Sequence, residues 1–276
     1  MKAGLGTYAF RYAISKGALP GRKALDLTGF LEFCNKHDVK VVQICENIPL
    51  HKLTDRELGD AYDLTKKYSI EPEIGTAGYS SDHLGAYIRI AAGFNSHVLR
   101  TVLNAGKDQT GEIRSELLKI IPQLEKTGLT LAIENHFDLT PEELIRLIEE
   151  INHPSVMICI DPLNSITRLR GINETVMMLS RHIASAHIKD VRIARKGTGF
   201  MISGCRLGEG IAEAENYITW VYRANPRCNI FLEQWMDPLE SEEATLAEEE
   251  KWILHGLNFL REKIKGLASS ELNYQL

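Results

Sequence analysis

The 276-residue sequence predicts an α/β fold, a single (β/α)8 TIM barrel in which residues 1–276 form one domain. Short apolar runs alternate with longer amphipathic stretches along the whole chain, and no Pro/Ser-rich linker or shift in composition divides it. The length is close to the roughly 250 residues typical of this fold. A doubly wound open sheet is the alternative, but GLGTYAF, near the start, is not the glycine-rich phosphate turn that would favour it.

The expected strands are short runs rich in aliphatic and β-branched residues. In chain order they are AGLGTYAF (3–10), VKVVQICE (39–46), IEPEIG (70–75), HVLRTVL (97–103), LTLAIE (129–134), VMICID (156–161), IASAHI (183–188) and NIFLE (229–233). Eight such runs are the number that a closed parallel barrel requires.

Amphipathic helices are expected between the strands. Two of them open with capping patterns: Thr54 is followed by Glu57, and Thr140 by Pro141 and Glu143. The predicted helices cover residues 24–37, 54–68, 140–151, 171–182, 213–223 and about 240–264. We interpret the acidic run at the start of the last helix as a solvated face.

Composition excludes several classes of function. A net charge of −5 and a pI near 6.0 give no general attraction to nucleic acid or anionic membranes, and no apolar run could cross a bilayer. The five cysteines are scattered and form no C-x-x-C pair, which is typical of reduced thiols. The first residues do not resemble a secretion signal, so we expect a cytoplasmic protein with a small-molecule partner.

Four late strands each end on a residue that could bind a metal: Glu134, Asp161, His187 and Glu233. Residues two apart in a strand share a face, so Glu134 should project with Ala132. The same parity lets all four side chains point into the barrel, at the carboxyl end where barrel enzymes carry their sites.

Three carboxylates that meet at one place repel each other unless a positive charge lies between them. One such residue alone is more often a helix cap or a core side chain, but the joint pattern predicts a single divalent cation. Oxygen ligands with one imidazole favour Mn²⁺ or Mg²⁺, with Co²⁺ or Zn²⁺ as alternatives.

The strings IENH, DPLNS, AHIKD, RLGEG and FLEQW occur in this order and resemble the xylose-isomerase-like barrel superfamily of sugar isomerases and epimerases. The resemblance implies that Glu134, Asp161, His187 and Glu233 bind one metal. It also implies that the two glutamates exchange protons with the substrate, that Arg206 holds it, and that the chain is a homo-oligomer.

One departure from that pattern is the segment AHIKDVRI, where Lys189 and Asp190 replace a second histidine. Together with VVQICENIPL, EIGTAG and the long loop KDVRIARKGTGFMISGCRLGEG, it resembles a subgroup similar to 3-oxo-isoapionate decarboxylase, which acts on an oxidised sugar acid.

The expected reaction is proton transfer at a carbon next to a carbonyl, through an enediolate that the metal stabilises. Glu134 or Glu233 would act as the base. This predicts a sugar isomerase or epimerase acting on a small keto-sugar. The alternative is a lyase on the same site, a decarboxylase or dehydratase of an oxo-sugar acid.

Four further residues are expected to contact the substrate: His136, Asn164, Lys189 and Arg206. A surface histidine, a helix cap and a plain salt bridge are equal alternatives for the first three. Lys189 and Arg206 together would suit a carboxylated substrate. We interpret Glu73, inside a strand, as a barrel-packing residue.

Two other functions are less consistent with the sequence. An apurinic endonuclease would need more histidines and a basic face for DNA, and this chain is acidic. A non-catalytic sugar-binding barrel would bind ligand without turning it over.

Overall fold

Eight parallel strands close into a barrel in the computed structural model, which describes residues 1–14 and 24–274, with side chains as far as residue 267. Around the barrel the order is β1-β10-β7-β6-β5-β4-β3-β2. The strands are β1 (Ala3–Gly6), β2 (Val41–Ile44), β3 (Glu71–Ala77), β4 (Val98–Val102), β5 (Thr130–Glu134), β6 (Val156–Ile160), β7 (Ile183–Ile188) and β10 (Asn229–Leu232). The predicted (β/α)8 fold class is therefore confirmed.

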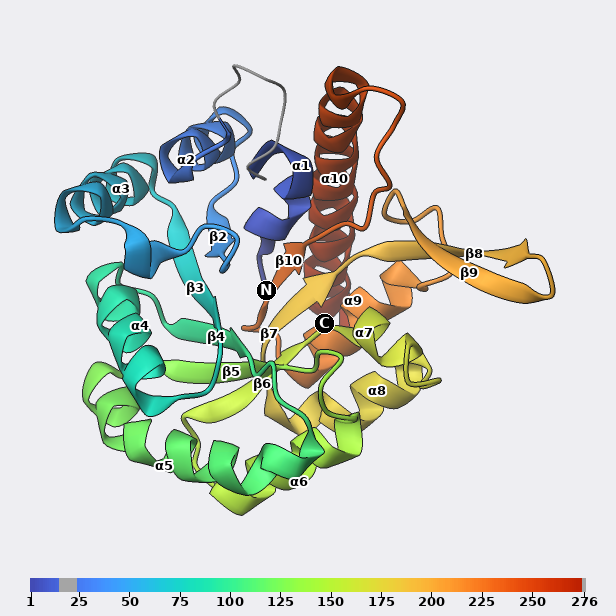
Figure 1. Ribbon diagram of the computed structural model, residues 1–276. Coiled ribbons are helices and arrows are strands. Elements are labelled where there is room, and N and C mark those ends of the chain that lie inside the picture. Colours follow the sequence, from blue (N-terminus) through green and yellow to red (C-terminus); the bar gives the residue numbers. More distant parts are fainter. Residues whose placement is uncertain (15–23, 275–276) are drawn as a thin grey trace.

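Helices surround the barrel as an outer ring (Figure 1). They are α1 (Arg11–Ile14), α2 (Leu27–Lys36), α3 (Asp55–Tyr68), α4 (Ser81–Gly93), α5 (Thr110–Thr127), α6 (Pro141–Ile151), α7 (Pro162–Ile166), α8 (Ile172–Leu179), α9 (Ala214–Ala224) and α10 (Glu242–Tyr274). Both predicted capping boxes form, at Thr54 with Glu57 and at Thr140 with Glu143. Within the described part of the chain, no helix has the length and apolar character needed to span a membrane.

The main hydrophobic core lies between the strands and the helices. In β5, Leu131 and Ile133 belong to this core, whereas Ala132 packs with Val98 and Cys159 in a separate cluster. The alternation shows that the odd-numbered side chains of β5 face the helices and the even-numbered ones face the barrel interior. Glu134, the last residue of β5, is therefore directed inward.

Three sequence expectations differ from the structure. Residues 7–10 form a 3-10 helix rather than the end of a strand. The Thr7 hydroxyl accepts from the Cys45 N–H (2.9 Å) and donates to the Asn47 side chain (2.6 Å), so a side chain replaces the strand ladder there. Helices α4 and α5 occupy stretches for which the sequence named no helix.

The third difference is the long loop expected after His187, which is largely a β-hairpin. β8 (Asp190–Lys196) pairs antiparallel with β9 (Gly199–Cys205), and Lys196 lies opposite Gly199. A two-residue turn joins them, and Gly197 supplies its positive φ of 59°. Figure 1 shows this hairpin extending away from the barrel.

Candidate metal centre

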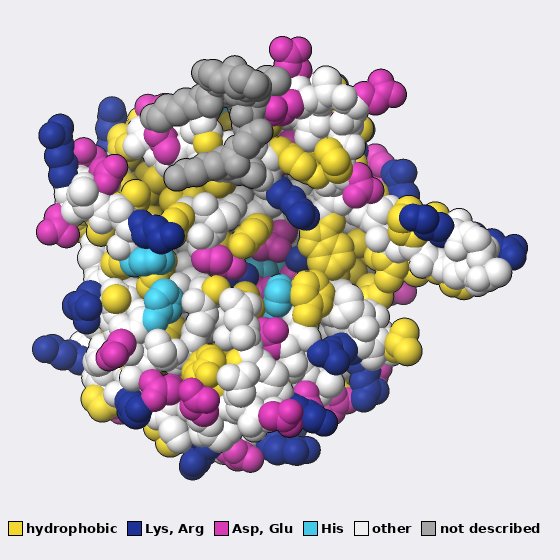
Figure 2. Space-filling model, in the orientation of Figure 1, with side chains coloured by type: hydrophobic (Ala, Val, Ile, Leu, Met, Phe, Trp, Pro, Cys, Tyr) yellow, Lys and Arg dark blue, Asp and Glu magenta, His cyan; other side chains and the backbone are white. Residues whose placement is uncertain are grey.

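The four strand-end residues meet at the carboxyl end of the barrel. The Nδ1 atom of His187 lies 3.4 Å from a Glu134 oxygen, 3.7 Å from an Asp161 oxygen and 3.4 Å from a Glu233 oxygen. All four side chains are buried. A cavity of about 490 Å³ opens above them and is lined by both glutamates. Figure 2 shows histidine and acidic side chains near the centre of this face.

The imidazole of His187 is oriented from below by a polar network inside the barrel. Its Nε2 lies 2.7 Å from the Gln43 carbonyl oxygen, and the Gln43 amide nitrogen lies 3.3 Å from Ser185 Oγ and 3.4 Å from a Glu73 oxygen. Ser185 also donates to Glu73 (2.7 Å). Because the amide nitrogen faces Glu73, its carbonyl must face His187, and this selects the Nε2–H tautomer. The lone pair of Nδ1 then points at the carboxylates.

Two buried polar atoms at this point have no hydrogen-bond partner among the described residues: His187 Nδ1 and Glu233 Oε1. They face one another at 3.4 Å. A buried polar atom without a partner costs about 1–3 kcal/mol. A cation placed between them would satisfy both, so this donor set fits a metal ion.

The charge balance also leaves room for a divalent cation. The carboxylates in or beside the cluster are Glu46, Glu134, Asp161 and Glu233, and the cations that contact them are Arg100 and Lys189. A histidine that binds a metal is neutral, so with a metal bound the four carboxylates and two cations would leave an excess of two negative charges, which a divalent ion would neutralise.

The pKa shifts have the same origin. Without a metal, the surrounding carboxylates overcome burial and raise the pKa of His187, so the imidazole is protonated. Burial alone would raise the pKa of Glu233, but the charges of this imidazolium and of Lys189 outweigh it and lower that pKa. Burial would raise the pKa of Asp161 too, and Lys189 is the main group that lowers it. The pKa of Lys189 lies above its ordinary value because Asp161 and Glu233 overcome its burial. Asp161 and Glu233 are therefore ionised, and the ammonium of Lys189 stays protonated between them.

Two asparagines hold the ligands in place. The Asn135 side chain donates to the Asp161 backbone carbonyl (2.6 Å) and accepts from the Asp161 N–H (2.7 Å), which ties the ends of β5 and β6 together. Asn164 donates to Glu134 Oε1 at 3.0 Å and also lines the cavity. Asn164 can thus hydrogen-bond both to the Glu134 carboxylate and to a molecule bound in the cavity.

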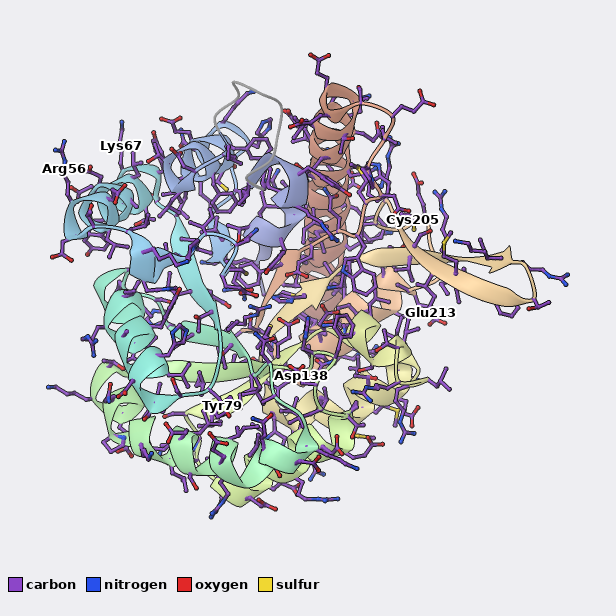
Figure 3. All side chains as sticks on the ribbon, viewed as in Figure 1. Arg56, Lys67, Tyr79, Asp138, Cys205 and Glu213 are labelled. Carbon is purple, nitrogen blue, oxygen red and sulfur yellow. The ribbon has the colours of Figure 1, made fainter. Side chains whose placement is uncertain are left out.

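Lys189 and His136 both line the cavity. The Lys189 ammonium donates to Asp161 and to Glu233 (2.9 Å to the latter) and lies 4.7 Å from the centre of the Trp235 ring. His136 is half-buried at the rim, and its Nδ1 has no partner among the described residues. The loop that carries His136 is tied down where Asp138, labelled in Figure 3, accepts from the Asn104 N–H at 2.9 Å.

Asp190 organises the RLGEG turn instead of contacting the ligands. Its carboxylate accepts from the backbone N–H groups of Val191, Gly208, Gly210 and Ala212, at 2.9–3.0 Å. A Cβ on Gly210 would lie 2.2 Å from an Asp190 oxygen. The glycine at 210 is therefore required by close approach to that carboxylate.

Arg206 does not reach the cavity. Its guanidinium pairs with Glu248 of α10, which also accepts from the Trp252 indole (2.9 Å), and Arg206 is not among the lining residues. A substrate-binding role would require this pair to open, and it stays a prediction.

Sequence reasoning missed Arg100. It donates to Glu134 (2.6 Å from Nε) and to Glu46, and it lines the cavity while almost fully buried. The signal was present in HVLRTVL, because an arginine inside an apolar strand needs a buried anion as partner. Gln43, inside the apolar run VVQI, likewise needs a buried hydrogen-bond partner.

Residues 23–263 match the family described as xylose isomerase-like TIM barrel. A curated relative, 3-oxo-isoapionate decarboxylase of Pectobacterium atrosepticum, is 28% identical over 264 residues, which cover 94% of this chain and 95% of the relative.

Two solved structures share the fold. A D-psicose 3-epimerase solved in the presence of D-fructose has a TM-score of 0.74 at 12% identity, covering 96% of this chain and 99% of that one. A xylose isomerase-like TIM barrel protein from Mycobacterium smegmatis, in complex with magnesium, has a TM-score of 0.70 at 13% identity, covering 95% and 97%. At these identities the likeness shows the fold alone.

Proposed function

This chain belongs to the xylose isomerase-like TIM barrel family, and from that premise we propose that it is a divalent-cation-dependent lyase that decarboxylates a small oxo-sugar acid. The observation that carries the proposal is Lys189, a buried ammonium that lines the cavity in contact with Asp161 and Glu233. The epimerase pattern that this chain resembles has a second histidine in this segment, whereas this chain has Lys189, a cation that can attract an anionic substrate. The decarboxylase relative, which aligns with nearly the whole chain, supports the same class.

The cation would be held by Glu134, Asp161, His187 and Glu233, and when bound it would polarise the oxo group as a Lewis acid. With three carboxylates and one imidazole as ligands, Mn²⁺ or Mg²⁺ suits the site best. The surrounding residues keep these ligands ready: Arg100 and Asn164 hold the two oxygens of Glu134, and Gln43 holds His187.

The bond that breaks joins the substrate carboxylate to the carbon next to the oxo group. Carbon dioxide leaves, the electron pair moves toward the oxo oxygen, and an enediolate remains. Lys189 keeps its proton in the resting site because its pKa is raised, so it can attract the anionic substrate. It then donates that proton to the strongly basic carbon and regains one from water.

A second candidate is the isomerase or epimerase predicted from the sequence. Glu134 and Glu233 both line the cavity, and each lies 3.4 Å from His187 Nδ1. Two carboxylates at one cavity suit a reaction in which one removes a proton and the other returns it.

The test is product analysis in D₂O on the Mn²⁺-loaded protein, with a panel of oxo-sugar acids and keto-sugars followed by NMR and mass spectrometry. We expect loss of CO₂, one deuteron at the neighbouring carbon, and at least a hundredfold slower turnover for Lys189→Met. Lys40→Met, an exposed lysine that pairs with Asp38, is the matched control. Deuterium uptake without loss of CO₂ would favour the second candidate, and binding without turnover would contradict both.

We also propose that the protein works in the cytoplasm. All five cysteines are free and buried, which suits a reducing compartment.

A further inference from the structure

The hairpin of β8 and β9, residues 190–205, forms an arm that extends from the barrel. All residues from 192 to 202 are exposed. The base of the arm is fixed, because Asp190 binds the RLGEG turn and a Cβ on Gly204 would lie 2.0 Å from the Trp235 carbonyl oxygen. Cys205, labelled in Figure 3, ends the arm where β9 rejoins the barrel. The arm is thus firmly anchored and yet uncovered along its length.

One face of the arm is apolar except for Arg195. Residues paired directly across two strands share a face, and the register pairs Ile193 with Ile202 and Arg195 with Phe200. Phe200 is 77% exposed, and Ile193 and Ile202 are also exposed. Ile211, whose N–H donates to the Val191 carbonyl (2.9 Å), adds another exposed apolar side chain at the base of the arm. A contiguous exposed apolar surface on a two-stranded ribbon indicates an interface.

The charges of the arm indicate what covers it. Between residues 191 and 204 the arm carries three cations and no acidic residue. Arg192 is already paired with Glu209 (3.0 Å), which leaves Arg195 on the face of Phe200 and Lys196 at the turn. Residues 237–250, the acidic segment, contain seven acidic residues and no Lys or Arg. Its exposed members include Glu240 and Glu243, next to the exposed side chain of Leu239.

The arm and the acidic segment lie on the same side of the molecule. The base of the arm contacts Trp235, two residues before the acidic segment. In Figure 1 the chain passes from β10 to α10 beside that base, and Figure 2 shows Asp and Glu side chains around the start of α10 and Lys and Arg side chains along the arm. A two-fold axis between two copies can therefore bring each arm onto the acidic segment of the other.

We propose that two copies of this chain associate by exchanging arms. The apolar face formed by Ile193, Phe200 and Ile202 covers Leu239 of the partner copy, and Arg195 and Lys196, near the tip of the arm, meet the partner copy's acidic segment. The contact is isologous, so every dimer contains it twice. Its opposite charges predict an association that weakens by roughly tenfold or more between about 50 and 500 mM salt.

The test is analytical ultracentrifugation of the full-length chain over a range of concentrations. We expect a dimer for the parent and a monomer for Phe200→Asp/Ile202→Asp. Two charge-reversal variants are made as well: Arg195→Glu/Lys196→Glu in the arm and Glu240→Lys/Glu243→Lys in the acidic segment. Each alone should be a monomer, because like charges face each other at both contacts.

An equimolar mixture of the two charge-reversal variants should dimerise again. In that heterodimer the acidic arm meets lysines and the unchanged basic arm meets glutamates, so both contacts are restored. Met177→Asp is the matched control, since Met177 is 72% exposed on α8, and it should leave the dimer intact. The proposal is overturned if the parent stays monomeric up to about 100 µM, if Phe200→Asp/Ile202→Asp still dimerises, or if the mixture remains monomeric.

Discussion

Replacing Gln43 by Met should weaken metal binding without disturbing the ligands themselves. Gln43 provides the only carbonyl recorded near His187 Nε2 among the described residues, at 2.7 Å and fully buried. Its loss frees the imidazole to turn and leaves the buried N–H with only the Cys159 sulfur, a weak acceptor 3.5 Å away. Losing an outer partner of a metal-bound histidine typically costs 10–100-fold in affinity, or about 1.4–2.7 kcal/mol.

The assay is competition between the protein and a fluorescent chelator for Mn²⁺ at pH 7. Thr175→Val is the control, because Thr175 is also fully buried and donates to the Gly171 carbonyl (3.0 Å) on α8, away from the site. Both variants should lose some stability, but only Gln43→Met should lose affinity. A folded Gln43→Met variant with a Kd within about twofold of the parent would refute the tautomer argument.

Three further predictions concern Glu73, Gly210 and Lys189. Burial raises the pKa of Glu73 from 4.5 to about 7, so the folded state binds this proton more tightly than the unfolded chain does. The stability that the proton provides is therefore lost as the pH rises from about 4.5 through 7. Urea unfolding of the parent should therefore lose up to about 3 kcal/mol relative to Glu73→Gln between pH 5 and 8, and parallel pH profiles would contradict this. Gly210→Ala should lower the melting temperature, at a cost of about 1–3 kcal/mol, because the new Cβ overlaps an Asp190 oxygen; Gly106→Ala, with open space around it, should not. Lys189→Met should destabilise the metal-free protein by about 3–5 kcal/mol, because buried carboxylates lose their cation. Added Mn²⁺ should restore most of this stability in a thermal melt. An equal loss of stability with and without Mn²⁺ would contradict the charge balance.

The sequence predicts the barrel and the convergence of the four strand-end side chains well, because both follow from periodicity. Residues two apart in a strand share a face, so Glu134, Asp161, His187 and Glu233 could be aligned by their positions at strand ends alone. The capping boxes are equally local, since three residues determine each of them. Local patterns of this kind need no knowledge of distant neighbours.

Features that depend on distant partners were beyond the sequence. Nothing in RLGEG indicates that Arg206 pairs with Glu248, forty-two residues further along the chain. Arg100 and Gln43 inside apolar strands indicate buried polar partners, but the sequence does not tell which strands of the closed barrel supply them. The hairpin was interpreted as a long loop, although its two strands are paired and a two-residue turn at Gly197 joins them.

The most direct test of the central claim is the metal content of the purified protein, measured by elemental analysis after loading with Mn²⁺ and removal of excess ion. We expect about one Mn²⁺ per chain in the parent and essentially none in a Glu134→Gln/Asp161→Asn double variant that still folds. A parent that retains no metal, or a double variant that retains as much as the parent, would contradict the assignment of these residues as the site of the cation.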